Sequence, residues 1–154
     1  MTTQSKQEQV KQTLETIIAK MGISASIDAV EYFDGLKFNV RSHEAGMLIG
    51  DNGTHLQAIN HIVKRISDKG RAEGDPHFQF LIDVNDYHKQ RTDHLHELAR
   101  MSAQRVRYFK KEIEMKPMNA FERRIIHAAL TECPDITTES TGEGDERRVV
   151  IRPL

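Results

Sequence analysis

The 154-residue sequence contains no tryptophan, only one cysteine and few aromatic residues. The lone Cys133 excludes an internal disulfide and a zinc site built from several cysteines, and it favours a reducing compartment. No apolar run reaches the length of about 18 residues that a membrane-spanning helix needs. The N-terminal residues also lack the apolar segment of a signal peptide. We therefore expect a cytoplasmic protein without membrane insertion.

The sequence also lacks an excess of charge, because 22 Lys and Arg residues face 23 Asp and Glu residues. This balance argues against a protein that binds nucleic acid through bulk electrostatics. Any basic site must instead be produced by the local placement of side chains on one face of an element.

Features of catalytic and metal sites are absent as well. His94 and His96 are two residues apart, which directs their rings apart on a helix, and no His-x-x-x-His pair occurs. The serines lack a nucleophile-elbow pattern. Asp83 and Asp86 are close enough to suggest a metal-dependent nuclease, but no further acidic cluster supports them. We expect no catalysis, no cofactor and no metal, with a nuclease as the weakest alternative.

The first half of the sequence predicts an α+β arrangement in the order helix, strand, strand, helix, Gly-x-x-Gly, helix, strand. A helical period over Val10–Met21 ends at Gly22, and Asp34-Gly35 predicts a turn between two strands. A short helix is expected over 44–49 and a strand over 78–84. The face of the helix after Gly53 that we expect to be buried consists of Leu56, Ile59, Ile62, Val63 and Ile66.

The second half begins with a long predicted helix over 85–109, followed by short strands over 112–115 and around Ile136 and Val149. The predicted buried face of the helix consists of Leu95, Leu98, Ala99, Ser102, Val106 and Phe109. A second face carries Arg100, Arg107 and Lys111, and it is either an ordinary solvated face or part of a basic track.

The segment 118–127 predicts a further helix. Asn119 and Glu122 have the spacing of a capping box, and Phe121, Ile125 and Ala129 are expected to form its buried stripe. Arg123 and His127 then fall on the opposite, outer face, about 40° apart, where a guanidinium and an imidazole suit a phosphate. Arg124 points about 100° away from Arg123. In the last strand, Arg148 shares a face with Arg152.

These C-terminal residues carry a resemblance. The pattern Arg-x-x-x-His within 119–127, with Thr138–Gly144 and Arg147–Ile151, resembles the R-3-H (Arg-x3-His) single-stranded nucleic-acid-binding domain of the bacterial Jag family. The resemblance implies that Arg123, His127, Arg124 and Arg148 contact nucleic acid. It also implies binding without chemistry.

The N-terminal half resembles a type II KH domain, on its element order and on Met47–Gly53 followed by Leu56 and Ile59. In the Jag family such a domain directly precedes the R-3-H domain, which implies a KH domain over 1–86 and an R-3-H domain over 87–154. The implied KH site is the loop Gly50, Asp51, Asn52 and Gly53, which would clamp about four nucleotides against an apolar groove. Ile49, Leu56 and Ile59 are the candidates for that groove.

The family resemblance implies single-stranded RNA as the ligand, with single-stranded DNA as a second candidate. It further implies post-transcriptional regulation linked to cell-envelope or division processes. Asp51 opposes the KH part of this hypothesis, because a carboxylate repels a phosphate by about 1 kcal/mol at about 4 Å even in water. The resemblance also implies a small KH-domain protein or a second copy of the chain as a protein partner. The alternative function is a protein-interaction adaptor with a degenerate KH domain.

Overall fold

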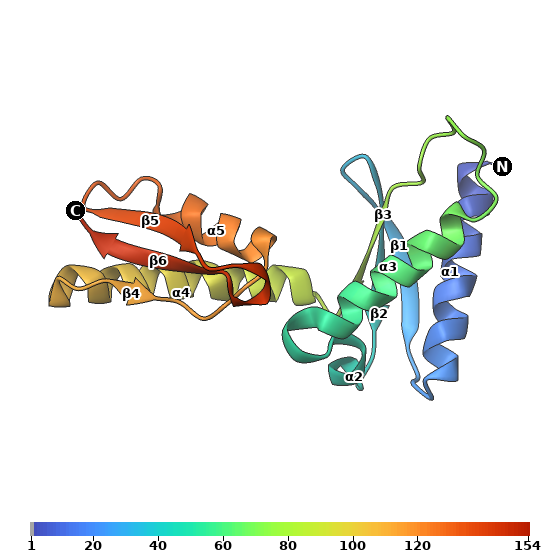
Figure 1. Cartoon of the computed structure of the whole chain (residues 1–154). Coiled ribbons are helices and arrows are strands. Elements are labelled where there is room, and N and C mark those ends of the chain that lie inside the picture. The colour runs from blue at the N-terminus through green and yellow to red at the C-terminus, as the bar shows by residue number, and fades with distance from the viewer. Residues whose placement is uncertain (1) are drawn as a thin grey trace. The chain divides into compact units, whose positions relative to one another are not determined.

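The computed structural model describes residues 2–154, and the chain divides after His88 into two compact units with separate cores (Figure 1). Both units combine helices with a small sheet, so the predicted α+β class is confirmed. None of the helices in the described part of the chain is long and apolar enough to cross a membrane.

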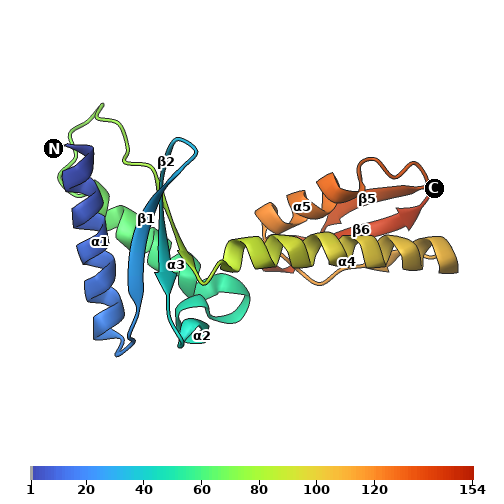
Figure 2. The ribbon, with the colours of Figure 1, turned by 180° about the vertical axis from the view of Figure 1, so that it is seen from behind.

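Unit 1 follows the element order that the sequence predicts. Its elements are α1 (Thr3–Lys20), β1 (Ser26–Tyr32), β2 (Gly35–Arg41), α2 (Ala45–Ile49), η1 (Asp51–Gly53), α3 (Thr54–Asp68) and β3 (Phe80–Val84). The sheet has the order β1-β2-β3, with β1 antiparallel and β3 parallel to the central β2. Helices α1 and α3 pack on one face of this sheet, as the front and rear views in Figures 1 and 2 show.

The predicted buried face of α3 is correct at Leu56, Ile59 and Val63, but it is wrong at Ile62 and Ile66. These two side chains are 49% and 40% exposed. The reason is geometric, because the sheet and α1 accept a narrower stripe of α3 than the helical period offers, and Ser67 completes the buried row instead.

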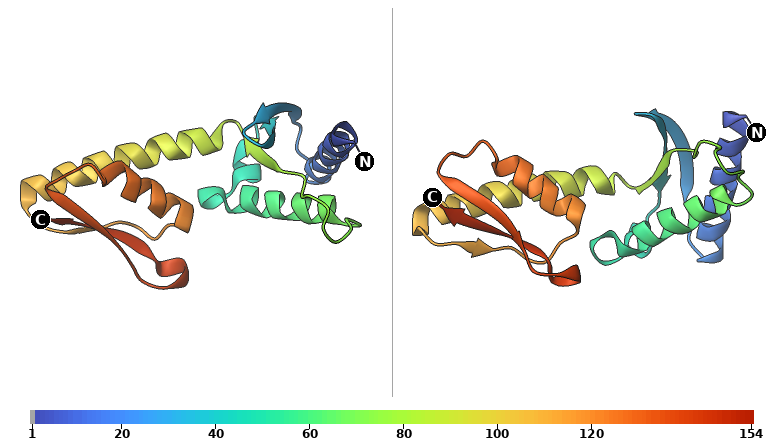
Figure 3. Two further views of the ribbon diagram at one scale, coloured as in Figure 1. Left: turned by 90° about the horizontal axis from the view of Figure 1, so that it is seen from above. Right: turned by 45° about the horizontal axis from the view of Figure 1, so that its top comes forward.

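Unit 2 consists of α4 (Tyr87–Phe109), β4 (Ile113–Glu114), α5 (Ala120–Leu130), β5 (Ile136–Thr141), η2 (Gly144–Glu146) and β6 (Arg148–Pro153). Its antiparallel sheet has the order β4-β6-β5, so β6 is the central strand. Both helices cover one face of this sheet (Figure 3). The prediction that Phe109 belongs to the buried face of α4 is wrong, because this side chain is exposed.

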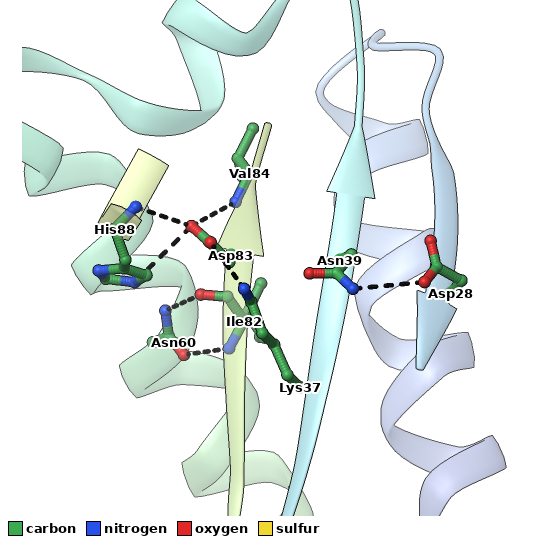
Figure 4. A network of polar contacts seen from close by, with 8 residues as sticks. All are labelled: Asp28, Lys37, Asn39, Asn60, Ile82, Asp83, Val84 and His88. Atoms are coloured by element: carbon green, nitrogen blue, oxygen red, sulfur yellow. Dashed lines mark hydrogen bonds and ion pairs between the residues drawn. The ribbon is translucent and has the colours of Figure 1, made fainter. Parts of the chain in front are cut away.

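A buried polar network stands at the end of β3 (Figure 4). Asp83 is 1% exposed, and its Oδ1 accepts hydrogen bonds from the backbone N–H groups of Val84 and His88 at 2.9 and 3.3 Å. Lys37 Nζ lies 3.4 Å from the other carboxylate oxygen. Asp83 therefore serves the packing of unit 1, and it does not form an exposed acidic pair of the kind that a nuclease needs.

Candidate nucleic-acid interface

Helix α5 begins with the predicted capping box, which the structure confirms. Asn119 Oδ1 accepts a hydrogen bond from the Glu122 N–H at 2.9 Å, and Glu122 Oε2 accepts one from the Asn119 N–H at 3.2 Å. The other oxygen of Glu122 accepts a hydrogen bond of 2.8 Å from Arg91 Nε of α4. Because Glu122 is buried, this ion pair ties the start of α5 to α4.

The predicted buried stripe of α5 is wrong at Phe121, whereas Ile125 and Ala129 are partly buried and pack against the core of unit 2. Ile126, Leu130 and Glu122 are buried, whereas Phe121 is 60% exposed. The helix is rotated relative to the prediction because Glu122 turns inward to meet Arg91, and the sequence period alone assigned this carboxylate to the surface. Phe121 and Arg124 consequently lie on the exposed face, while Arg123 and His127 flank the buried stripe.

Arg123 and His127 lie where α5 meets β5, and both are half-buried. His127 Nδ1 shares a hydrogen bond of 2.8 Å with the Thr138 hydroxyl of β5. Arg123 Nη1 donates a hydrogen bond of 2.5 Å to the carbonyl oxygen of Met118, just before the helix. Burial lowers the pKa of His127, and the nearby Arg123 charge lowers that pKa further. The imidazole is thus neutral at pH 7 and offers its Nε2 as a hydrogen-bonding group.

A third side chain, Arg147, joins these two. Its Nε donates a hydrogen bond of 2.9 Å to the Ser140 hydroxyl, and Ser140 lies on the same face of β5 as Thr138. The Arg147 carbonyl accepts the Met118 N–H at 3.1 Å, so Met118 bonds to both arginines. We call Arg123, His127, Thr138, Ser140 and Arg147 the α5–β5 seam. Arg147 was not among the predicted contacts, although its alternation with Val149 and Ile151 places it on the helix-facing side of the last strand.

The seam arginines differ from most other arginines of unit 2 in lacking a carboxylate partner within residues 2–154. Arg148 instead pairs with Glu114 and Glu146 at 3.5 and 3.3 Å. Arg152 pairs with Glu112 and Glu139, Arg100 with Glu97, and Arg107 with Asp135. The hydrogen bonds from Arg107 lower the pKa of the Asp135 carboxyl. Arg148 also faces away from the helices, so the structure does not bring it together with Arg123 and His127.

The Gly-x-x-Gly loop requires both of its glycines. Gly50 and Gly53 have φ angles of +70° and +79°. A Cβ atom on Gly50 would lie 2.5 Å from the His55 ring, and one on Gly53 would lie 2.9 Å from the Tyr87 ring. Asp51 and Asn52 are exposed at the tip, and α3 begins without a side-chain cap on its first N–H groups. The loop thus presents free backbone N–H groups of the kind that bind anions, but the Asp51 carboxylate lies next to them.

The apolar groove predicted beside this loop is wrong for two of its three residues. Leu56 and Ile59 are only 1% and 7% exposed, because they belong to the core of unit 1. Ile49 is half-buried and retains some accessible surface.

Comparisons with known proteins give one family match and several similar proteins. Residues 93–153 match the family model of the R-3-H domain. The chain is 31% identical over 148 residues to the RNA-binding protein KhpB of Clostridium symbiosum, covering 94% of this chain and 65% of that protein. Identity to the proteins of the same name from Bacillus subtilis and Lactiplantibacillus plantarum is 28% and 29%, covering 69% and 42% of those proteins. The chain thus spans between 42% and 69% of the length of these relatives.

Proposed function

We propose that the chain is a single-stranded RNA-binding protein of the Jag family, with a type II KH domain in unit 1 and an R-3-H domain in unit 2. The observation that carries this proposal is the α5–β5 seam, where Arg123 and Arg147 have no carboxylate partner in the described chain and His127 lies one helical turn after Arg123. The seam lies inside the region that matches the R-3-H family model. The relatives named as RNA-binding proteins support the same ligand.

The seam suits a phosphate of an unpaired strand. Arg123 and Arg147 are held by neutral acceptors, so each keeps its full charge and further N–H donors for a phosphate oxygen. His127 Nε2 adds a hydrogen-bonding group on the same helix as Arg123, and β5 pairs on one side only, within the described sheet. Nothing in this arrangement activates a nucleophile, so the proposed activity is binding.

The Gly-x-x-Gly loop contributes less in this proposal. The element order and the two glycines support a KH domain, and glycine lets a nucleic-acid backbone approach the loop closely. Asp51 weakens the loop because its exposed carboxylate stands beside the donors of α3. The seam therefore provides the main contact and the loop an auxiliary one.

The proposal is tested by measuring binding of a 12-nucleotide fluorescent RNA by anisotropy at several salt concentrations. We expect saturable binding that weakens with salt, with a logarithmic slope of about −1.4 if two phosphates are contacted on a single strand. A duplex of the same sequence should bind less tightly, because the seam reads an exposed strand. Absence of saturable single-strand binding even at low salt would contradict the proposed function.

Asp51→Lys is expected to strengthen RNA binding by about tenfold at low salt, because it replaces repulsion with attraction at the loop. The matched control is Asp34→Lys, which makes the same charge change at an exposed turn of the same unit. If both variants bind alike, the gain reflects net charge only and the loop does not contact RNA.

A protein-interaction adaptor is the second candidate function, and the exposed Ile62 and Ile66 of α3 favour it. They line a shallow groove with His61, Arg65, Asp68 and Lys69. Its partner would be a small KH-domain protein or a second copy of the chain. A role in regulating transcripts of envelope or division proteins is a further part of the proposal, and crosslinking in cells with sequencing of the bound RNA tests it.

A further inference from the structure

The last turn of α4 exposes two aromatic rings that the core of unit 2 does not use. Tyr108 is 81% and Phe109 60% exposed, whereas Val106 and Ala103 fill the core beside them. The two rings meet edge to face, with their centroids 4.9 Å apart. Exposed rings of this size offer π-faces on which an unpaired base can stack.

Three cations accompany the rings. Arg105 lies one helical turn before Tyr108 and Phe109, and Lys110 and Lys111 follow directly. None of the three forms an ion pair with any residue in the range 2–154. Two other arginines in the C-terminal half of α4 are ion-paired, Arg100 with Glu97 and Arg107 with Asp135. Positive charge outside ion pairs is thus concentrated beside the exposed rings at this helix end, although the charge of Lys110 also acts on Asp135 and helps to lower the pKa of that carboxyl.

The backbone of Lys110 adopts a conformation that disfavours residues with a side chain. Its φ angle is +54°, and its N–H donates to the Val106 carbonyl at 2.9 Å, which is the left-handed position that closes a helix. Glycine is favoured there, since a side chain is strained at positive φ. A lysine at this position retains a charge at the expense of local stability, which is typical of functional sites.

We propose that this α4 end, formed by Arg105, Tyr108, Phe109, Lys110 and Lys111, is a second contact for single-stranded RNA. One or two bases stack on the rings, and the adjacent phosphates pair with the cations. The inference rests on the proposed function and adds a site to it. A protein partner fits less well, because covering the rings would bury three cations that form no ion pair within residues 2–154.

The absence of tryptophan from the chain permits a direct test. Tyr108→Trp introduces a single tryptophan at the site, and Tyr32→Trp places one at a partly exposed position in unit 1 as the control. On titration with a 12-nucleotide single-stranded RNA, we expect quenching of Trp fluorescence in the Tyr108→Trp variant only, over the concentration range in which anisotropy reports binding. Binding without quenching at this position overturns the inference and leaves the proposed function intact. No binding at all overturns the proposed function.

Two further variants separate a binding role from a structural one. Tyr108→Ala combined with Phe109→Ala should weaken binding about tenfold without unfolding the protein, because both rings are exposed. Lys110→Gly should raise the midpoint of thermal unfolding and weaken RNA binding at the same time. Unchanged RNA affinity in both variants would overturn the inference. Loss of self-association in sedimentation with unchanged RNA affinity would assign the rings to a contact between chains instead.

Discussion

Replacing Arg123 and His127 together by alanine is expected to weaken binding of single-stranded RNA by about 30- to 100-fold, which corresponds to about 2 to 3 kcal/mol. The two side chains bridge α5, β5 and the segment before α5 through Met118 and Thr138, so they stand in fixed positions before RNA arrives. The double substitution removes both the charge of Arg123 and the fixed positions of the two hydrogen-bonding side chains. Anisotropy at constant salt measures the effect, and circular dichroism checks that the variant is folded.

Arg124→Ala is the matched control, because it removes the same charge from the same helix on its exposed face. The loss of RNA affinity in Arg124→Ala should be several times smaller than the loss in the double variant. The loop substitution Asn52→Asp should also have the smaller effect, since the loop is the auxiliary contact. If Asn52→Asp proves more damaging than the seam substitutions, the main site belongs to unit 1.

Glu122→Ala is expected to destabilise unit 2 by about 2 to 4 kcal/mol, because it leaves the half-buried Arg91 without a counter-charge and removes half of the capping box. The transition of unit 2 in urea denaturation should shift to lower concentration. Amide hydrogen exchange in α5 should rise, while exchange in unit 1 stays as in the wild type.

Glu97→Ala provides the comparison, since it also breaks an ion pair with an arginine of α4, but an exposed one. Its denaturation midpoint should be inseparable from that of the wild type. Glu122→Gln keeps a hydrogen-bond acceptor for the cap and should retain part of the stability. Equal effects of Glu97→Ala and Glu122→Ala would show that burial does not strengthen the Arg91 pair.

Features set by neighbouring residues could be predicted from the sequence. The capping box of Asn119 and Glu122 depends on four consecutive residues. The turn between β1 and β2 was also predicted, but one residue too late, because Phe33 and Asp34 form it and Gly35 already belongs to β2. The order of helices and strands follows from the hydrophobic periodicity of the sequence, which can be recognised within each single helix or strand. Side-chain spacing was therefore sufficient for the fold class and for the position of α5.

Features set by distant partners could not be predicted. The inward turn of Glu122 depends on Arg91, 31 residues earlier, and the neutralisation of Arg152 depends on Glu112, 40 residues earlier. Helical periodicity has no access to such pairs, and it therefore assigned Phe121 to the core. The family resemblance likewise assigned Arg148 to nucleic-acid contact, although two carboxylates pair with it.

The strand order of unit 2 has a consequence for how the protein is made. β4 and β5 pair only with β6 within the described sheet, and β6 is the last of the three to leave the ribosome. No two strands of this sheet can therefore pair until residues 148–153 have been synthesised. Until then, the sheet cannot cover the apolar faces of α4 and α5. Unit 1 has all of its strands by Val84 and is free to fold earlier. Nascent chains stalled before β6 should thus be protease-resistant in the first unit and sensitive in the second.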